Sequence, residues 1–425
     1  MLKKQETGLF LKECEFLHKT DNLLHLREQY FLPENKVYLC GNSLGLQPVS
    51  TPQFIDNELK IWAKMGVEGH FEGTTNWYNY HEYIDKILSK LCGALQTEVC
   101  CANSLTANIH MLFSTFFKPT SRKKKILIEN PVFSSDYYAI ASQIEFHGFS
   151  IADTLIEIAP KSGFYTIDTN DILNAIQHHK DELAMIWLSG VNFYSGQKID
   201  MDAISKEANK FGIIIGLDLA HAIGNVELHL HDWGVDIAAW CSYKYLNSGP
   251  GGVGGYYIHE KHHNTFPTLR GWWGYKESER FEMNKNFEPE KGAKAWQWSN
   301  LPIVSMATHR AALELFDKIP FGTLRQKSEL MTSLLYSALK TIFENKKNVI
   351  NIITPELPHE RGCQLSIMTP NKGYQLYKTL EAQGIICDYR KPDVIRIAPV
   401  PMYNTFEDIK KTIIAFETAT DEIFK

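Results

Sequence analysis

Two residues in the middle of the chain, Asp218 and Lys244, have the types and the placement that catalysis needs. The apolar run 213–217 reads as a strand and ends in Asp218, and the next apolar run, 236–242, is followed by Tyr243 and Lys244. In an open α/β sheet, ligands bind beyond the carboxyl ends of the strands. We therefore expect both side chains to face one crevice.

A carboxylate and a lysine in one crevice suit the chemistry of pyridoxal phosphate. The lysine binds the cofactor aldehyde as a Schiff base, and the carboxylate keeps the pyridine nitrogen protonated so that the ring accepts electrons. A structural ion pair between Asp218 and Lys244 explains the same pattern equally well. Pyridoxal phosphate is therefore a candidate cofactor that needs support from other residues.

Two further tracts give that support. Residues 103–106 join an apolar run to the helix-like stretch 107–117, so Thr106 and nearby backbone N–H groups are expected at a helix N-terminus, which is a natural phosphate site. An ordinary N-cap is the alternative. The tract FSSD at 133–136 follows the next expected strand, and Phe133 is placed to stack on a cofactor ring or to fill the core.

Three other motifs invite different functions. The sequence GPGGVG at 249–254 fits a dinucleotide-binding loop, but the next residues, 255–258, read as a strand where that loop requires a helix. The sequence GNSLG at 41–45 fits a hydrolase nucleophile elbow, but Pro48 and Pro52 interrupt the helix that an elbow requires. His229 and His231 could share a strand face as metal ligands, but surface or capping roles are expected for them, and no metal site is predicted.

The elements that must position these residues follow from the hydrophobic pattern. From about residue 98 to 257, short apolar runs alternate with amphipathic ones, which predicts an α/β domain with a mostly parallel sheet. From about residue 302 a helical pattern precedes short runs at 349–353, 364–368, 385–387 and 394–398, and a last helix begins at Asn404 or Thr405. This order, a helix followed by three or four strands and a final helix, predicts a small α+β domain.

Length and composition fit this organisation. The 425 residues are enough for more than one folding unit, and 44 basic against 49 acidic side chains leave a formal charge of −5. A strongly basic nucleic-acid binder and a charge-rich disordered chain are thereby disfavoured. No apolar run is long enough to span a bilayer, and eight cysteines without CxxC spacing predict a cytoplasmic protein. Of the nine tryptophans, Trp62, Trp187 and Trp240 lie in apolar runs and are expected in the core.

Taken together, these tracts resemble the kynureninases, which are pyridoxal-phosphate enzymes of the aspartate-aminotransferase fold, class V branch. The resemblance covers most of the chain and is densest in these tracts: YLCGNSLGLQP (38–48), ANSLT (102–106), FKP (117–119), FSSD (133–136), LDLAHAIGNVEL (217–228), HDWGVD (231–236), WCSYKYLN (240–247), RGW (270–272), WSN (298–300) and VIRIAP (394–399). It implies a PLP-dependent transferase fold of type I.

The resemblance also implies roles for individual residues. Lys244 would be the Schiff-base lysine, Asp218 the partner of the pyridine nitrogen, and Tyr243 a phosphate ligand and candidate proton relay. The other cofactor-binding positions would be Leu105, Thr106, Phe133, Ser134, Ser135, Asp136, Ser189, His221, Trp272 and Asn300. The substrate-binding positions would be Ser43, His70, Asn300 and Arg396, of which Arg396 would bind the substrate α-carboxylate through its planar fork.

The implied reaction is the hydrolysis of L-kynurenine, or its 3-hydroxy form, to L-alanine and anthranilate or 3-hydroxyanthranilate. This places the chain in the kynurenine pathway, in tryptophan breakdown or in NAD biosynthesis. A homodimer is implied in which Trp272 and Asn300 reach the neighbour's cofactor. The polar residues His70 and Asn300 suggest that the 3-hydroxy substrate is used at least as well as kynurenine. The expected organisation is an N-terminal segment (1–45), a large cofactor-binding domain (46–305) and a small domain (306–425).

Two other functions remain open at this point. A cysteine desulfurase or a related class V lyase would need a mobile catalytic cysteine, whereas Cys363 and Cys387 lie within or beside strand-like runs and read as buried thiols. A non-catalytic binding protein of the same fold would not need Lys244, Asp218 and Arg396 together.

Overall fold

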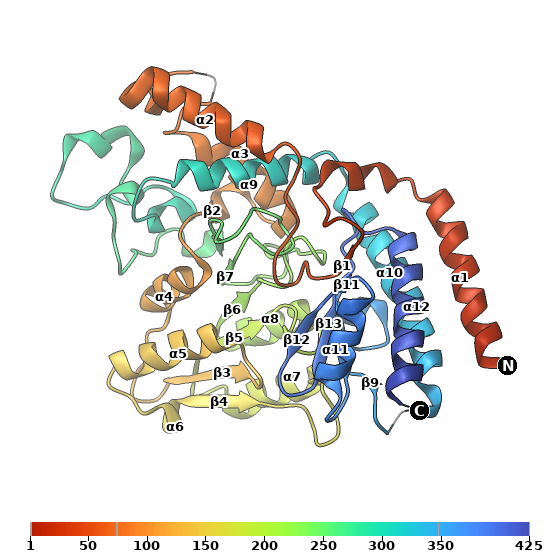
Figure 1. The fold of residues 1–425 in the computed structure, drawn as a ribbon. Coiled ribbons are helices and arrows are strands. Elements are labelled where there is room, and N and C mark those ends of the chain that lie inside the picture. The colour runs from red at the N-terminus through yellow and green to blue at the C-terminus, as the bar shows by residue number, and fades with distance from the viewer. Residues whose placement is uncertain (1, 74, 347, 425) are drawn as a thin grey trace.

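The computed structural model describes residues 2–73, 75–346 and 348–424, and its largest sheet has seven strands (Figure 1). In spatial order these strands are β2 (Val99–Cys101), β8 (Gly255–Ile258), β7 (Ile237–Trp240), β6 (Ile214–Asp218), β5 (Leu183–Ser189), β3 (Lys125–Glu129) and β4 (Leu155–Ile158). Strand β8 runs antiparallel to both of its neighbours, and all other pairs are parallel. The predicted mostly parallel α/β sheet is confirmed.

Both faces of this sheet are buried. Along β5, Ile186 and Leu188 belong to one buried cluster, while Met185 and Trp187 belong to a second cluster. Helices α4 and α5 contribute to the second cluster, and helices α3, α7 and α8 contribute to the first. Burial on both faces explains why the strands read as continuous apolar runs. The helices of this part are α2 (Thr51–Met65), α3 (Tyr80–Cys92), α4 (Leu105–Phe116), α5 (Ser134–Phe146), α6 (Ile151–Thr154), α7 (Thr169–His179), α8 (Met201–Lys210) and α9 (Ile303–Phe316).

The C-terminal part is built around an antiparallel sheet with a buried cluster of its own. Its strands, in spatial order, are β12 (Asp388–Arg390), β13 (Val394–Ile397), β10 (Leu365–Met368) and β9 (Asn351–Ile352). Its helices are α10 (Phe321–Phe343), α11 (Gly373–Ala382) and α12 (Phe406–Ile423). Thr405 is the N-cap of α12, as predicted, and forms a capping box with Asp408.

The N-terminal segment packs on this C-terminal part. Helix α1 (Leu2–Thr20) lies against α10 and α12, and strand β1 (Val37–Tyr38) pairs in parallel with β11 (Ile385–Ile386) (Figure 1). Cys14, Val37 and Leu39 belong to the same buried cluster as the C-terminal helices. The run 385–387 is therefore a strand, as expected, but it pairs with β1 and not with the four-stranded sheet.

The predicted domain boundary between residues 305 and 306 falls inside α9, which packs on α2 and α3. We propose that the two parts meet nearer to Pro320, which precedes α10. Residues 1 and 425, which end the predicted ranges, lie outside the described residues.

Short 3₁₀ helices connect the larger elements. They are η1 (Leu24–Gln29), η2 (Gly66–His70), η3 (Gln96–Glu98), η4 (Glu260–His262), η5 (Trp272–Gly274), η6 (Glu277–Glu282), η7 (Gly292–Trp296), η8 (Glu344–Lys346) and η9 (Pro358–Glu360). Among the described residues, no helix has the length and apolarity that would let it cross a membrane.

One prediction about the core is wrong. Trp187 and Trp240 are fully buried, but Trp62 on α2 is 65% exposed. Its neighbours in sequence are apolar, yet the helix turns this side chain outward, and a short apolar run does not reveal which helical face meets the core.

Candidate active site

Lys244 lies just beyond the end of β7, in the turn that follows Trp240. The side chain is largely buried, and its Nζ lies 5.7 Å from the centre of the Phe133 ring and 5.9 Å from that of Tyr243. Within the described ranges, no hydrogen bond or ion pair engages Nζ. The structure therefore presents a free amine near two aromatic rings.

Asp218 ends β6, directly opposite Ser189 at the end of β5. Its Oδ1 accepts a hydrogen bond of 2.7 Å from the Ala220 N–H. Burial raises the pKa of Asp218, and the nearby charge of Lys244 opposes that shift. The carboxylate and the amine thus face one crevice, as the strand order predicted.

Two more buried carboxyl groups lie close enough to Asp218 to be affected by its charge. Burial raises the pKa of Glu129 to about 7 and raises that of Asp136 well above its usual range, and the charge of Asp218 adds to both shifts. Asp136 accepts a hydrogen bond of 2.8 Å from Trp187 Nε1, while its Oδ2 has no partner among the described residues. The region has an excess of acidic groups, which favours a cationic or protonated ligand.

A pocket extends from Asp218 and Lys244 to the N-terminus of α4. The N-cap of this helix is Ser104, whose side chain makes no capping hydrogen bond, so the first N–H groups are available to an anion. Nine predicted residues line the pocket: Leu105, Thr106, Phe133, Ser135, Ser189, Asp218, His221, Tyr243 and Lys244. Sequence reasoning missed Ser104 and Phe193, which also line it.

Two predicted cofactor positions in the 133–136 tract do not line the pocket. Ser134 is exposed at the first turn of α5, and Asp136 is fully buried behind the pocket. Phe193 packs edge-to-face on Phe133, with ring centres 5.3 Å apart. No sequence motif marked Phe193, because it follows β5 in an irregular segment.

Arg396 is held by an acidic partner that the sequence did not suggest. Asp388 on β12 stands opposite Arg396 on β13, and its carboxylate accepts from Nε at 2.8 Å and from Nη2 at 2.6 Å. Ser43 Oγ donates to Asp388 at 2.7 Å, and Arg396 Nη1 donates to the Phe193 carbonyl at 2.8 Å. Burial alone would raise the pKa of Asp388, but the bonds from Arg396 and Ser43 lower it below its ordinary value. The guanidinium is thus connected to the pocket wall through Phe193.

The remaining predicted residues lie outside this pocket. His70 is half-buried at the end of η2, where its ring packs edge-on against Trp77. Trp272 is 44% exposed and donates from Nε1 to the Arg280 carbonyl, and Asn300 is exposed. One chain therefore does not bring these three side chains to Lys244.

The competing motifs lack the structure that their chemistry requires. Residues 255–258 form β8, so a strand follows the glycine turn, as expected, and dinucleotide binding is disfavoured. Ser43 lies in a turn, and the next helix begins only at Thr51. His229 and His231 lie in an irregular segment and not on a strand.

Known proteins decide the family. A kynureninase of Flavobacterium johnsoniae is 43% identical over 411 residues, which cover 95% of this chain and 96% of that protein. The human kynureninase is 43% identical over 93% of this chain and 90% of its own length, and the Myxococcus xanthus protein is 44% identical over 91% of both. The chain belongs to the kynureninase family. The family model of the kynureninase C-terminal domain matches residues 324–416.

Solved structures identify the fold of this chain. The apo cysteine desulfurase of Thermococcus onnurineus NA1 has a TM-score of 0.78 at 16% identity and covers 94% of this chain and 98% of its own. A C-DES variant, described as carrying glycine covalently linked to its PLP cofactor, has a TM-score of 0.77 at 17% identity, over 92% and 98% of the two chains. The predicted fold of PLP-dependent class V enzymes is confirmed.

The two cysteines considered for a desulfurase mechanism do not have the properties of a catalytic cysteine. Cys363 and Cys387 are buried, and burial raises the pKa of Cys363 to about 12 and that of Cys387 further. A catalytic cysteine needs access and a lowered pKa. These two are structural thiols, as the sequence indicated.

Pyridoxal phosphate is the cofactor of the kynureninase family, and the pocket fits it. The free amine of Lys244, the uncapped N-terminus of α4 and the aromatic ring of Phe133 match the aldehyde, the phosphate and the ring, respectively. The buried His221 Nδ1 also has no partner in the described part of the chain. These unpartnered groups are what a polar ligand would satisfy.

Proposed function

We propose that the protein hydrolyses the Cβ–Cγ bond of L-kynurenine or 3-hydroxy-L-kynurenine, giving L-alanine and anthranilate or 3-hydroxyanthranilate. The observation that carries this proposal is the 43% identity to a kynureninase over 95% of the chain. The free amine of Lys244 in a pocket beside Asp218 supports it. Hydrolysis in the kynurenine pathway would serve tryptophan breakdown or NAD biosynthesis.

Four positions would hold the cofactor. Lys244 would bind its aldehyde, Asp218 its pyridine N–H, and the α4 N-terminus with Thr106 its phosphate. Phe133 would cover one face of the ring. When bound, the cofactor supplies an electron-accepting ring conjugated with the substrate amine.

The protein's own groups would then handle the substrate and its protons. Arg396 would bind the α-carboxylate, because a planar guanidinium pairs well with a carboxylate. Once the substrate amine has taken the place of Lys244, the freed Nζ is placed to remove the α-proton as a general base. Burial raises the pKa of Tyr243, so its hydroxyl stays protonated and can donate near the phosphate or relay a proton.

We also propose a homodimer with composite active sites. Phe71, Trp272 and Phe281 are 53%, 44% and 58% exposed and form one aromatic group with ring centres 5.5–6.0 Å apart. An exposed apolar cluster of this kind marks an interaction surface. A partner subunit covering it would bring Trp272 and Asn300 towards the neighbouring pocket. A cytoplasmic location is proposed as well, since all eight cysteines are unpaired thiols.

Turnover of L-kynurenine by the purified protein tests the function. We expect fluorescent anthranilate and alanine in equal amounts, and no turnover by Lys244→Ala because the general base is gone. Borohydride should fix the cofactor to wild-type Lys244 and not to the variant. Lys261→Ala, at a lysine in η4 that does not line the pocket, is the control and should keep full activity. Absence of both turnover and borohydride fixation in the wild type would refute the proposal.

The ring hydroxyl of the substrate gives a second test. We expect kcat/KM for 3-hydroxykynurenine to equal or exceed that for kynurenine, because a buried polar group left unpaired costs about 1–3 kcal/mol. His70→Phe should lower kcat/KM for the hydroxylated substrate and spare the other. A clear preference of the wild type for kynurenine would contradict this expectation.

A further inference from the structure

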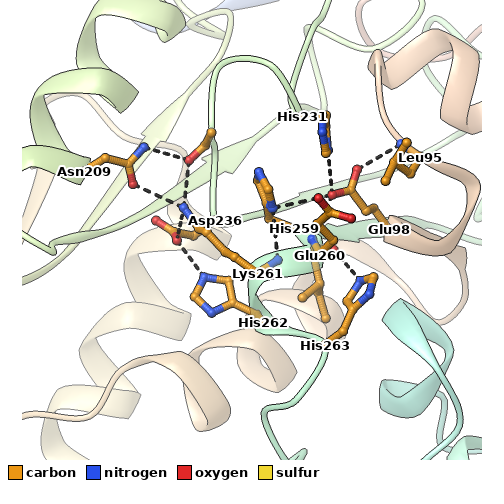
Figure 2. Close-up of polar contacts among 12 residues, drawn as sticks. Leu95, Glu98, Asn209, His231, Asp236, His259, Glu260, Lys261, His262 and His263 are labelled. Carbon is orange, nitrogen blue, oxygen red and sulfur yellow. Dashed lines mark hydrogen bonds and ion pairs between the residues drawn. The ribbon is translucent and has the colours of Figure 1, made fainter.

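A cluster of histidines and a carboxylate lies at the edge of the large sheet, apart from the active site (Figure 2). Glu98 comes directly before β2, His259 directly after β8, and His231 lies in the segment that leads to β7. Because β8 is antiparallel to β2 and β7, these three positions meet at one end of the strands. Lys244 follows the opposite end of β7.

The two histidines approach the same oxygen atom of Glu98. His231 Nδ1 donates to Glu98 Oε1 at 2.9 Å, and His259 Nδ1 lies 3.5 Å from the same oxygen. The two imidazole rings are stacked, with their centres 5.0 Å apart. In a tetrahedral zinc site with bonds of ~2.0–2.1 Å, ligand atoms lie about 3.3 Å apart. The observed separations of 2.9 and 3.5 Å bracket that value.

Charge also favours a cation at this place. The Glu98 side chain is fully buried, and in the described part of the chain the only basic groups within ion-pair distance of it are His231 and His259, which are charged only when protonated. Its oxygens also accept from the Leu95 and Glu260 N–H groups, which fix the carboxylate in place (Figure 2). Neither of those neutral N–H groups balances its charge. A divalent ion would do so.

The state of His259 suits a metal ligand. Its Nδ1 accepts a hydrogen bond of 3.2 Å from the Lys261 N–H, so this nitrogen carries a lone pair, which a metal ion would take over from that N–H. The Lys261 ammonium does not oppose a cation directly, because it is paired with Asp236 at 2.7 Å.

We propose that Glu98, His231 and His259 bind a divalent transition-metal ion, with zinc as the preferred ion. Two imidazoles and one carboxylate leave a fourth position for water, and His231 is 29% exposed, so the site is open to solvent. Bound metal would tie together the start of β2, the end of β8 and the segment before β7. Its role is structural, because Lys244 lies beyond the other end of β7.

Zinc titration of the metal-free holoenzyme by calorimetry tests this proposal. We expect one zinc ion per chain in the wild type and a rise in the thermal unfolding temperature on binding. His231→Gln and His259→Gln should each weaken the affinity at least about 100-fold, since even indirect partners of metal ligands contribute 10–100-fold. Cobalt, which reports its ligands in visible absorption, should give a tetrahedral spectrum in the wild type only.

The matched control is His229→Gln, an exposed histidine two residues from His231. It should keep the wild-type affinity and stoichiometry, and all three variants should keep the wild-type kcat/KM. No zinc binding by the wild type, or binding unchanged in His231→Gln and His259→Gln, would overturn the proposal. Zinc affinity is measured without kynurenine turnover, so the metal site and the proposed function can fail separately.

Discussion

The Arg396 guanidinium is already hydrogen-bonded within the protein, because Asp388 accepts from its Nε and Nη2 atoms. The Phe193 carbonyl accepts a hydrogen bond from Nη1, so Asp388 and Phe193 together fix the orientation of the guanidinium plane. Nη2 also donates to Ser43 Oγ at 3.3 Å, so the second N–H of Nη1 is the one that can still meet a carboxylate among the described residues. We therefore propose that Asp388 positions Arg396 for substrate binding.

Replacing Asp388 with Asn tests this positioning. The amide keeps the shape but offers one acceptor oxygen and no charge, and a hydrogen bond to a charged group contributes about 1.5–3 kcal/mol. We expect KM for kynurenine to rise about 10–100-fold with kcat changed much less. Steady-state kinetics measure both constants.

Two comparisons make the test specific to Arg396. Asp393→Asn, in the turn between the same two strands, should leave KM unchanged. In an Arg396→Ala background, Asp388→Asn should add nothing to KM, because it acts through the missing guanidinium. An unchanged KM in Asp388→Asn alone would contradict the positioning role.

The sequence revealed Arg396 through its family tract but not Asp388. The signal was nevertheless available: a Pro-containing turn at 391–393 separates two short strands, so residues 388 and 396 are expected to face each other across the hairpin. Lys244, Asp218 and Thr106 were predictable because strand ends and helix starts determine where they lie. Phe193 was not, because irregular segments follow no periodicity.

At the scale of elements, helix α9 carries a buried histidine that sequence reasoning did not mark. His309 is fully buried, and neither ring nitrogen has a hydrogen-bond partner among the described residues. Burial lowers the pKa of His309 to about 3 from an ordinary value of 6.5. Between these two values the unfolded chain binds one proton more than the folded chain. Stability contributed by the neutral ring is therefore present above pH 6.5 and is lost as the pH falls.

His309→Leu should make the stability less dependent on pH. One pH unit below the unfolded pKa, the histidine costs about 1.4 kcal/mol of unfolding free energy. Between pH 7.5 and pH 5.5, the unfolding free energy measured with urea should fall by about 1.3 kcal/mol less in the variant than in the wild type. His178→Gln, an exposed histidine, is the control. Equal pH dependence in wild type and His309→Leu would show that the ring is not kept neutral by the fold.

The elements themselves were largely predictable, and their long-range partners were not. Alternating runs identified β6, β7, α5 and α8, and the N-cap signal identified the start of α12. The run 385–387 was recognised as a strand, but its partner β1 lies far away in sequence, and local pattern does not encode such a pairing. The exposed side chain of Trp62 shows that a local apolar run also does not reveal which face of a helix packs on the core.

At the scale of the whole molecule, the proposed homodimer makes a complementation test possible. Lys244→Ala and Trp272→Ala should each be impaired as homodimers. If Trp272 serves the neighbour's pocket, a mixed dimer of the two variants has one site with both residues intact. Random mixing in equal amounts should then restore about a quarter of wild-type activity, since half of the dimers are mixed and each has one good site.

The control is a mixture of Lys244→Ala with Asp218→Asn, two residues of the same pocket. This mixture also creates mixed dimers, but each pocket contains one of the two substitutions and activity should not return. Failure of the Lys244→Ala and Trp272→Ala mixture to regain activity, with mixed dimers shown by mass spectrometry, would place Trp272 outside the neighbour's site.

The packing of α1 on α10 and α12 has a consequence for how the protein is made. A ribosome releases α1 well before α10 and α12, the two helices on which it packs. At about 5–20 residues per second, α1 must wait tens of seconds for α12. During synthesis its apolar face is free for chaperones, while the large sheet can already form. Helix α1 therefore completes its native packing only after α12 has been made.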